Sequence, residues 1–276
     1  MIVLAGVLLA LAGALYFWQR QEELPPVQPP TSGAVETPAP VSSTGPATPP
    51  IRYPVDGLTT DAPPRVALPA LSRADEEVRN TLTSWLGKDA VVSFLQLDDF
   101  VRHVVATVDS LGRTHVAPRL WPVNSTPGRF IVVQQGDALI AAPGNAERYA
   151  AFVSFVEGID TRRALALYVR WYPWFQQAYE ELGYPGRYFN DRLVEVIDQL
   201  LAAPVPAEPV ELRLTEVKGP IPSIRPWVRY EFADPSLEAL AAGQKMMIRV
   251  GPAQQQRLKQ KLVELRAGVT AAATPR

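Results

Sequence analysis

Residues 160–183 read DTRRALALYVRWYPWFQQAYEELG, and this stretch decides the fold. Its apolar side chains recur at steps of three and four, which is the spacing of one face of an α-helix. One stripe consists of Leu165, Tyr168, Tyr172, Phe175, Tyr179 and Leu182, and a second of Leu167, Trp171, Trp174 and Ala178. Both stripes stay in phase across Pro173. We therefore predict one helix that is capped by Asp160, ends at Gly183 and is kinked at Pro173.

The predicted helix has an unusually broad apolar surface. At about 100° per residue, the two stripes together cover about half of its circumference. A helix lying on the outside of a domain buries less than this. We therefore expect a central helix with neighbours on two sides, a pattern that predicts a core and does not by itself indicate a chemistry.

The other helices and strands follow from the same periodicities. Helical spacing of apolar residues predicts helices over residues 72–86, 97–111, 145–156, 190–201, 234–240 and 252–267. Alternation with period two predicts short strands over residues 129–133, 139–142, 210–214 and 228–232, the first two forming a hairpin. The predicted fold class is mainly α (α+β): a compact multi-helix domain at residues 70–268, around the central kinked helix, with a few short β strands. Residues 269–276 are predicted to be a disordered tail.

An apolar stretch at the N-terminus indicates a membrane anchor. Residues 2–18, IVLAGVLLALAGALYFW, carry no charge and would extend about 25 Å as a helix. The aromatic triplet at its end suits the interface of a membrane. We predict a transmembrane anchor at residues 1–19. A cleaved signal peptide is the alternative, because residues 12–14 have the small-x-small form of a cleavage site. Arg20 directly follows this stretch, and its charge favours a topology with the domain in the cytoplasm. For a domain in the periplasm we therefore expect basic residues upstream in the native chain.

Residues 20–69 form a proline-rich segment. Between Leu24 and Pro69 the chain has 13 prolines among Ala, Thr, Ser and Val, with almost no aromatic residue. Such a segment buries too little apolar area to offset the entropy of ordering it, which predicts a disordered linker. Fully extended at about 3.1 Å per residue, it would reach about 140 Å and hold a domain well clear of a membrane.

Composition excludes several classes of function. Residues 70–276 carry 24 basic and 23 acidic side chains, so we expect no long-range attraction to nucleic acid. The chain has no cysteine, which excludes disulfides, thiol catalysis and thiolate zinc sites. Glycine-rich phosphate loops, a nucleophile elbow and a metalloprotease helix are missing from the sequence. We therefore assign no catalytic residue, no metal site and no cofactor.

The two histidines, His103 and His115, are the candidates for a base that works at neutral pH. His103 lies four residues after Asp99, so a helix would place a carboxylate and an imidazole on one face, as an acid–base pair requires. A surface ion pair beside a buried valine face explains the spacing equally well, and we favour this interpretation. A metal site would need a third ligand, which no spacing identifies.

Aromatic residues are dense around the central helix. The candidate contacts for a partner or a glycan are Trp171, Trp174, Tyr184 and Tyr188. Exposed rings beside Glu180, Glu181 or Asp191 could stack on sugars, and paired carboxylates could cleave a glycosidic bond. Most of these rings keep helical spacing, however, so core packing is the favoured interpretation.

Basic residues are dense near the C-terminus. They are Lys245, Arg249, Arg257, Lys259, Lys261 and Arg266, and Glu264 is the acidic residue among them. On a helix they could form a contact face for anionic lipid or an acidic partner, and we take Lys245 and Arg249 as candidate contacts. A solvated helix exterior is the favoured interpretation.

The order of several short motifs is similar to that of a known family. The motifs are Asp98-Asp99-Phe100-Val101-Arg102, Ala106-Thr-Val-Asp109, Tyr172-Pro173, Gln177-Ala178-Tyr179, Glu181-Leu182-Gly183-Tyr184, Tyr188-Phe189-Asn190 with Arg192-Leu193, Ile197-Asp198-x-Leu200-Leu201, Phe232-Ala233-Asp234-Pro235 and Gly243-Gln244-Lys245. Over residues 70–267 the chain resembles proteobacterial single-span envelope proteins that contain a domain of unknown function. The resemblance implies an N-terminal anchor, a proline-rich tether and one mostly helical domain. It implies no activity and no catalytic residue.

These observations lead to two functional hypotheses. The first is a non-enzymatic binding or scaffolding protein in the bacterial inner membrane, whose domain is displayed in the periplasm to an envelope protein partner. The alternative is a carbohydrate-active envelope protein that binds or cleaves cell-wall glycan. Both depend on the membrane anchor and on a domain that folds by itself.

Overall fold

The central helix of the domain is α6, Thr161–Glu181. The structure is a computed structural model, and it describes residues 49–58, 68–207, 209–215 and 229–271. The side chain of Asp160 caps α6 by accepting a hydrogen bond of 2.7 Å from the backbone N–H of Arg163. The helix continues through Pro173, and the side chains of Trp171 and Phe175 are fully buried. The single helix predicted from the two apolar stripes is confirmed.

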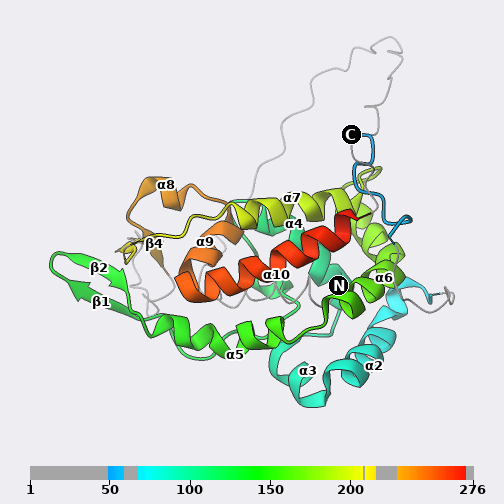
Figure 1. The fold of residues 1–276 in the computed structure, drawn as a ribbon, viewed down its shortest axis with the longest axis horizontal. Coiled ribbons are helices and arrows are strands. Elements are labelled where there is room, and N and C mark those ends of the chain that lie inside the picture. The colour runs from blue at the N-terminus through cyan, green and yellow to red at the C-terminus, as the bar shows by residue number, and fades with distance from the viewer. Residues whose placement is uncertain (1–48, 59–67, 208, 216–228, 272–276) are drawn as a thin grey trace, which may run out of the picture.

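Three long helices pack against α6 and form the main core with it. They are α4 (Phe100–Leu111), α7 (Phe189–Leu201) and α10 (Pro252–Thr270). Figure 1 shows α10 crossing the middle of the molecule, with α7 on one side and α5 (Asn145–Glu157) on the other. The apolar faces of these helices meet in one contiguous cluster. Burial of such faces is the main favourable term in folding.

Two further helices lie beside this core at its lower edge in Figure 1, α2 (Ala74–Leu86) and the shorter α3 (Lys88–Phe94). A 3₁₀ turn, η1 (Leu71–Arg73), precedes α2, and a second, η2 (Pro118–Leu120), follows α4. Gly87 separates α2 from α3 with a φ of +86°, which an L residue rarely adopts. The helix end predicted at Gly87 is therefore confirmed.

Four short strands form an antiparallel sheet in the order β1-β2-β3-β4. They are β1 (Val132–Gln135), β2 (Ala138–Ala141), β3 (Glu211–Leu214) and β4 (Tyr230–Phe232). The hairpin β1–β2 extends away from the helices in Figure 1. Leu212 and Phe232 pair across β3 and β4 and form a second, smaller core with Ile248. The predicted α+β class, mainly helical with a small sheet, is confirmed.

The hairpin is joined to the helices by Asn145 in the first turn of α5. Its side chain accepts a hydrogen bond from the backbone N–H of Ile131 at 2.9 Å and donates to the carbonyls of Ile131 and Ala142, at 2.6 and 2.9 Å. The helix predicted over residues 145–156 begins at Asn145, and Gly144 occupies the N-cap position. The buried amide therefore satisfies strand and loop groups in place of helix groups.

Two short helices, α8 (Pro235–Glu238) and α9 (Ala242–Arg249), connect the sheet to α10. Helix α9 comes very close to α4 and α7 at Gly243. A Cβ at this position would lie 2.5 Å from Cδ2 of Leu200 and 3.1 Å from the carbonyl oxygen of Leu111. Only a residue without a side chain permits this approach.

Three boundary predictions are corrected by the structure. The predicted linker included residues 49–58, but these pack on the domain, and Val55 is 2% exposed. The predicted tail included Val269, which is 1% exposed because α10 runs on to Thr270. The predicted helix over residues 97–111 begins only at Phe100, since Asp99 has a left-handed φ of +48°.

Within the part of the chain that the structure describes, no helix has the length and apolarity that a bilayer crossing requires. The anchor predicted at residues 1–19 lies outside the described residues, and so does most of the predicted linker.

Candidate functional site

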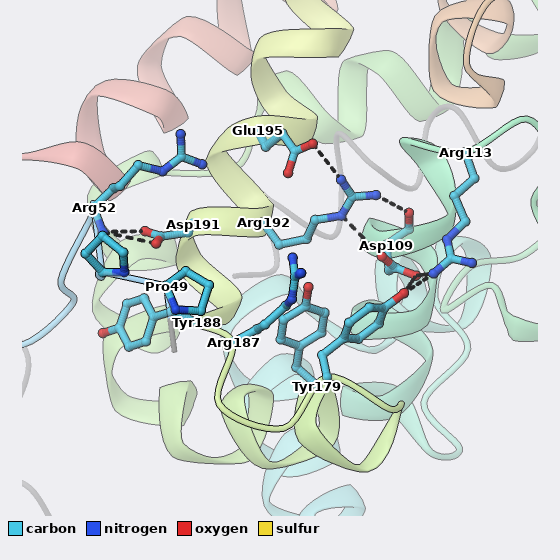
Figure 2. Close-up of a pocket in the computed structure, with 12 residues that line it drawn as sticks. Pro49, Arg52, Asp109, Arg113, Tyr179, Arg187, Tyr188, Asp191, Arg192 and Glu195 are labelled. Atoms are coloured by element: carbon cyan, nitrogen blue, oxygen red, sulfur yellow. Dashed lines mark hydrogen bonds and ion pairs between the residues drawn. The ribbon is translucent and has the colours of Figure 1, made fainter. Parts of the chain in front are cut away.

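A pocket of about 430 Å³ opens where four segments, from three separate stretches of the chain, come together. The segments are the end of α4, the end of α6 with the turn that follows it, the start of α7, and residues 49–58, which we call the strap. The lining residues are Pro49, Pro50, Arg52, Asp109, Arg113, Tyr179, Tyr184, Arg187, Tyr188, Asp191, Arg192 and Glu195. Because four of them are arginines, we call it the arginine pocket. Figure 2 shows Arg52 on one side, Arg113 on the other, and Arg187 and Arg192 between them.

Asp109 is the buried carboxylate of the arginine pocket. It lies on the apolar face of α4 and is 6% exposed. Arg192 of α7 donates from Nε to its Oδ1 at 3.2 Å and from Nη2 to its backbone carbonyl at 2.8 Å. Tyr184 donates its hydroxyl to Oδ2 at 3.1 Å. A buried carboxylate costs free energy unless it is paired and hydrogen-bonded, and these contacts meet that requirement.

Arg113 and Glu195 extend this charge network toward solvent. Nη2 of Arg113 lies 2.7 Å from Oδ2 of Asp109 and also contacts the Tyr184 hydroxyl. Glu195 pairs with Nη1 of Arg192 at 3.0 Å. Burial alone would lower the pKa of Arg192, but Glu195 and Asp109 outweigh it and raise that pKa. Arg192 is therefore fixed between two carboxylates.

Gly112 makes room for the Arg192 guanidinium at the end of α4. A Cβ on Gly112 would lie only 2.7 Å from Nη2 of Arg192 and 2.8 Å from Oε1 of Gln199. The helix predicted over residues 97–111 ends just before this glycine. The structure adds that its missing side chain is what allows the arginine to lie across the helix end.

Tyrosine rings form one wall of the pocket. The rings of Tyr179 and Tyr184 are stacked with their centroids 4.6 Å apart, and Tyr179 also packs on Phe189. Burial, together with the nearby Asp109 carboxylate, raises the pKa of Tyr179 to about 12. The Tyr179 hydroxyl therefore stays protonated at any physiological pH.

Asp191 closes the side of the pocket formed by the strap. Its carboxylate accepts hydrogen bonds from the backbone N–H of Arg52 at 3.0 Å and of Tyr53 at 2.8 Å. The hydroxyl of Tyr188 accepts from the N–H of Val55 at 2.9 Å. These bonds satisfy backbone groups of the strap, so the Asp191 carboxylate is already engaged.

Two arginines of the pocket keep their guanidinium groups available. Neither Arg187 nor Arg52 makes a side-chain hydrogen bond or ion pair with any residue that the structure describes, and both are exposed. Arg52 lies near the ring of its neighbour Tyr53. The carboxylates that line the pocket are paired with Arg192 and Arg113 or bound to the strap. The remaining positive charge suits an anion, because a guanidinium matches the geometry of a carboxylate or a phosphate.

The structure buries two of the four aromatic candidates and places the other two in the wall of the arginine pocket. Trp171 and Trp174 are 0% and 3% exposed, so neither ring can stack on a sugar. The indole N–H of Trp174 donates to the carbonyl of Pro69 at 2.8 Å. Tyr184 and Tyr188 are half-buried and line the arginine pocket. The favoured interpretation, core packing, is thus confirmed for the two tryptophans, and they are withdrawn as candidate contacts.

The basic residues near the C-terminus are used within the domain. Lys245 is buried and pairs with Glu238 at 2.8 Å, and Arg249 donates to the carbonyl of Tyr230 at 2.8 Å and lies over the ring of Phe232. Arg257 binds the Glu157 carboxylate, and Arg266 binds the Asp198 carboxylate. Lys259 donates to the carbonyl of Ala203. Lys261 donates to the carbonyl of Ile159 and pairs with Glu264. The expectation of a free basic face is corrected, because these cations bind groups on neighbouring elements.

The acid–base pair considered at Asp99 and His103 does not form. Asp99 pairs with Arg102, Nη1 to Oδ1 at 3.3 Å. Nδ1 of His103 is buried and has no hydrogen-bond partner among the described residues. The described part of the chain also holds no group of three or more His, Cys, Asp or Glu side chains that could bind a metal ion.

Sequence reasoning missed the charged members of the pocket. Asp109 stands on the same helical face as Val101, Val105 and Val108, and a carboxylate within a buried stripe is a signal for a buried ion pair. Its partner Arg192 lies 83 residues away, and no local spacing connects the two. The motif strings that carry the family resemblance nevertheless include Asp109, Tyr179 and Arg192.

The fold and the pocket define a class: a mainly helical α+β domain with an arginine pocket at the junction of its long helices. The chain belongs to the DUF3014 family, described as proteins of unknown function, whose family model matches residues 100–266. This confirms the resemblance to a family of unknown function. The match covers α4 to α10 and every pocket residue except those of the strap. Comparisons with curated proteins and with solved structures give no match.

Proposed function

We propose that this protein is a single-pass, membrane-anchored binding protein, and that the arginine pocket receives an anionic group of its partner. The anchor is the apolar segment at residues 1–19, in the bacterial inner membrane, and the domain is displayed in the periplasm. The proposed ligand group is a carboxylate or a phosphate, carried by an envelope protein partner. The observation that carries the proposal is the guanidinium of Arg187, which has no hydrogen-bond or ion-pair partner among the described residues, in a pocket whose carboxylates are all engaged.

The electrostatics of the pocket support an anion over a cation. Four arginines face three carboxylates, and the carboxylates already hold Arg192, Arg113 and the strap. An incoming anion would therefore add a missing partner without breaking an existing pair. The stacked tyrosine wall supplies a face that partly excludes water, which strengthens such an ion pair.

The proposal is tested by titrating the full-length protein, purified in detergent, with inorganic phosphate or with glutarate. Calorimetry is expected to show saturable binding of at least one of the two, and comparing them distinguishes a phosphate from a carboxylate ligand. In Arg187→Gln the binding should weaken about five- to tenfold, since a charge-assisted hydrogen bond is removed.

Arg162→Gln provides the matched control. Arg162 is an exposed arginine on α6 that lines a different groove, so its replacement changes the net charge by the same amount. The control variant should bind like the wild type. Equal binding by the wild type and Arg187→Gln, or heats that never saturate, would contradict the proposal.

A further inference from the structure

We propose that the strap, residues 49–58, completes the arginine pocket, so that binding of an oxyanion and docking of the strap stabilise each other. This inference rests on the proposed function of the pocket. It adds Arg52 as a ligand-binding residue contributed from outside the part of the chain that the family model matches. The strap lies within the segment predicted to be a tether (residues 20–69), so occupancy of the pocket would alter how the domain is attached to the part of that tether before residue 49.

The strap is held by polar contacts that face the first turn of α7. Asp191 binds two successive backbone N–H groups of the strap, and the Asn190 side chain donates to the carbonyl of Tyr53 at 2.9 Å. Asn190 is fully buried, and it also accepts a bond from Tyr168 and donates to the carbonyl of Val269. The Asn190 side chain is therefore held in place by bonds on both of its polar atoms. If the strap moved away, this buried amide would lose its hydrogen bond to Tyr53.

Apolar contacts hold the strap in the same place. Val55 is 2% exposed and Leu58 is 9% exposed, and both belong to the main core. Ile51, in contrast, is 53% exposed and lies at the end of the strap nearer to the predicted tether. The strap is thus anchored at residues 53–58 and only lightly held at residues 49–52, which are the residues that reach the pocket.

This division is what couples docking to binding. Pro49, Pro50 and Arg52 line the pocket, and the Arg52 guanidinium has no carboxylate partner in the described part of the chain. An anion between Arg52 and Arg187 would fix the lightly held end. Because such coupling is reciprocal, any contact that holds this end of the strap in place must also strengthen binding of the anion.

Two variants and one exchange measurement test the coupling in the full-length protein, with inorganic phosphate as the probe. Arg52→Gln keeps the backbone bonds to Asp191 but removes the cation, and phosphate binding should weaken about fivefold. Asp191→Ala removes the bonds that hold the Arg52 end of the strap and also removes a negative charge. A purely electrostatic role of Asp191 would make phosphate bind more tightly in this variant, whereas the coupling predicts weaker binding.

Amide hydrogen exchange supplies the reciprocal measurement. In the wild type, phosphate should slow exchange at the amides of Arg52 and Tyr53, but not in Arg52→Gln. Asp191→Ala should exchange faster at these amides with or without phosphate. Phosphate binding of wild-type strength in both variants would overturn the coupling and leave the proposed function standing. A wild type that binds neither phosphate nor glutarate, and whose exchange responds to neither, would overturn both.

Discussion

Asp109 lies on the apolar face of α4, where an unpaired carboxylate would cost several kcal/mol. Arg192, Arg113 and Tyr184 surround it, and Gly112 leaves the space that Arg192 needs. A charge cluster of this kind is weak support for stability, because well-packed apolar residues could fill the same volume. In the proposed function this cluster has a second role, which is to hold Arg192 and Arg113 in place before an anion arrives.

At the residue scale, the raised pKa values of the buried tyrosines predict how the free energy of unfolding depends on pH. Burial raises the pKa of Tyr179 to about 12 and raises the pKa values of Tyr168 and Tyr172 as well. In the unfolded chain these groups titrate near about 10. Their contribution to stability is therefore complete below about pH 10 and is lost as the pH rises toward 12. Urea unfolding between pH 8 and 12 should show this decrease in the free energy of unfolding.

Tyr179→Phe serves as the matched variant in that experiment. It keeps the stacked ring but has no ionisable hydroxyl, so its free energy of unfolding should fall less steeply above pH 10. Absorbance at 295 nm would follow the ionisation directly. A wild type whose stability is constant from pH 8 to 12 would show that these tyrosines ionise alike in the folded and unfolded chain.

At the scale of elements, the close approach of α9 to α4 and α7 depends on Gly243. Gly243→Ala should destabilise the protein by about 1–3 kcal/mol, because the new methyl group would meet Leu200 and the Leu111 backbone carbonyl. The gain in helix propensity, up to about 1 kcal/mol, offsets part of this cost. Thermal or urea unfolding measures the difference between variant and wild type.

Gly144→Ala is the control, because a Cβ there meets no atom within 4 Å and the φ of Gly144 is −61°. It should change stability by less than about 0.5 kcal/mol. If Gly243→Ala were as stable as this control, α9 would have to move away from α4 without cost, and the packing described above would not hold.

Most of the helices could be predicted from the sequence because each carries a long apolar stripe. Helix α3 could not, since its seven residues bury only Val91 and are too short to show a period. The strap was missed for a different reason. Its composition is that of a linker, and it is ordered only by partners such as Asp191, which lies 138 residues away from Tyr53. For the same reason the sequence could suggest Tyr184 and Tyr188 but could not assemble the arginine pocket.

At the scale of the whole molecule, the proposed anchor, tether and domain predict a definite topology. The chain has no cysteine, so any maleimide labelling of a variant with one engineered cysteine comes from that position. Ser84→Cys lies on the exposed side of α2. In cells with a permeable outer membrane, a maleimide that cannot cross the inner membrane should label this cysteine.

A cysteine added before Met1 should stay unlabelled until the inner membrane is disrupted. Labelling of both positions in intact cells, or recovery of the Ser84→Cys protein in the soluble fraction without residues 1–19, would contradict the proposed topology. Both outcomes leave the anion titration unaffected, because that experiment depends only on the folded domain.

One buried amide gives the domain a particular mechanical property. Asn190 donates to the carbonyls of both Tyr53 and Val269, so the strap and the last turn of α10 meet at a single residue. Tension transmitted along the proposed tether would reach residues 49–52 first, and the hydrogen bonds of the strap to Asp191 and Asn190 would be loaded before any helix of the core. Under a pulling force the strap should detach first, while the four long helices stay packed together.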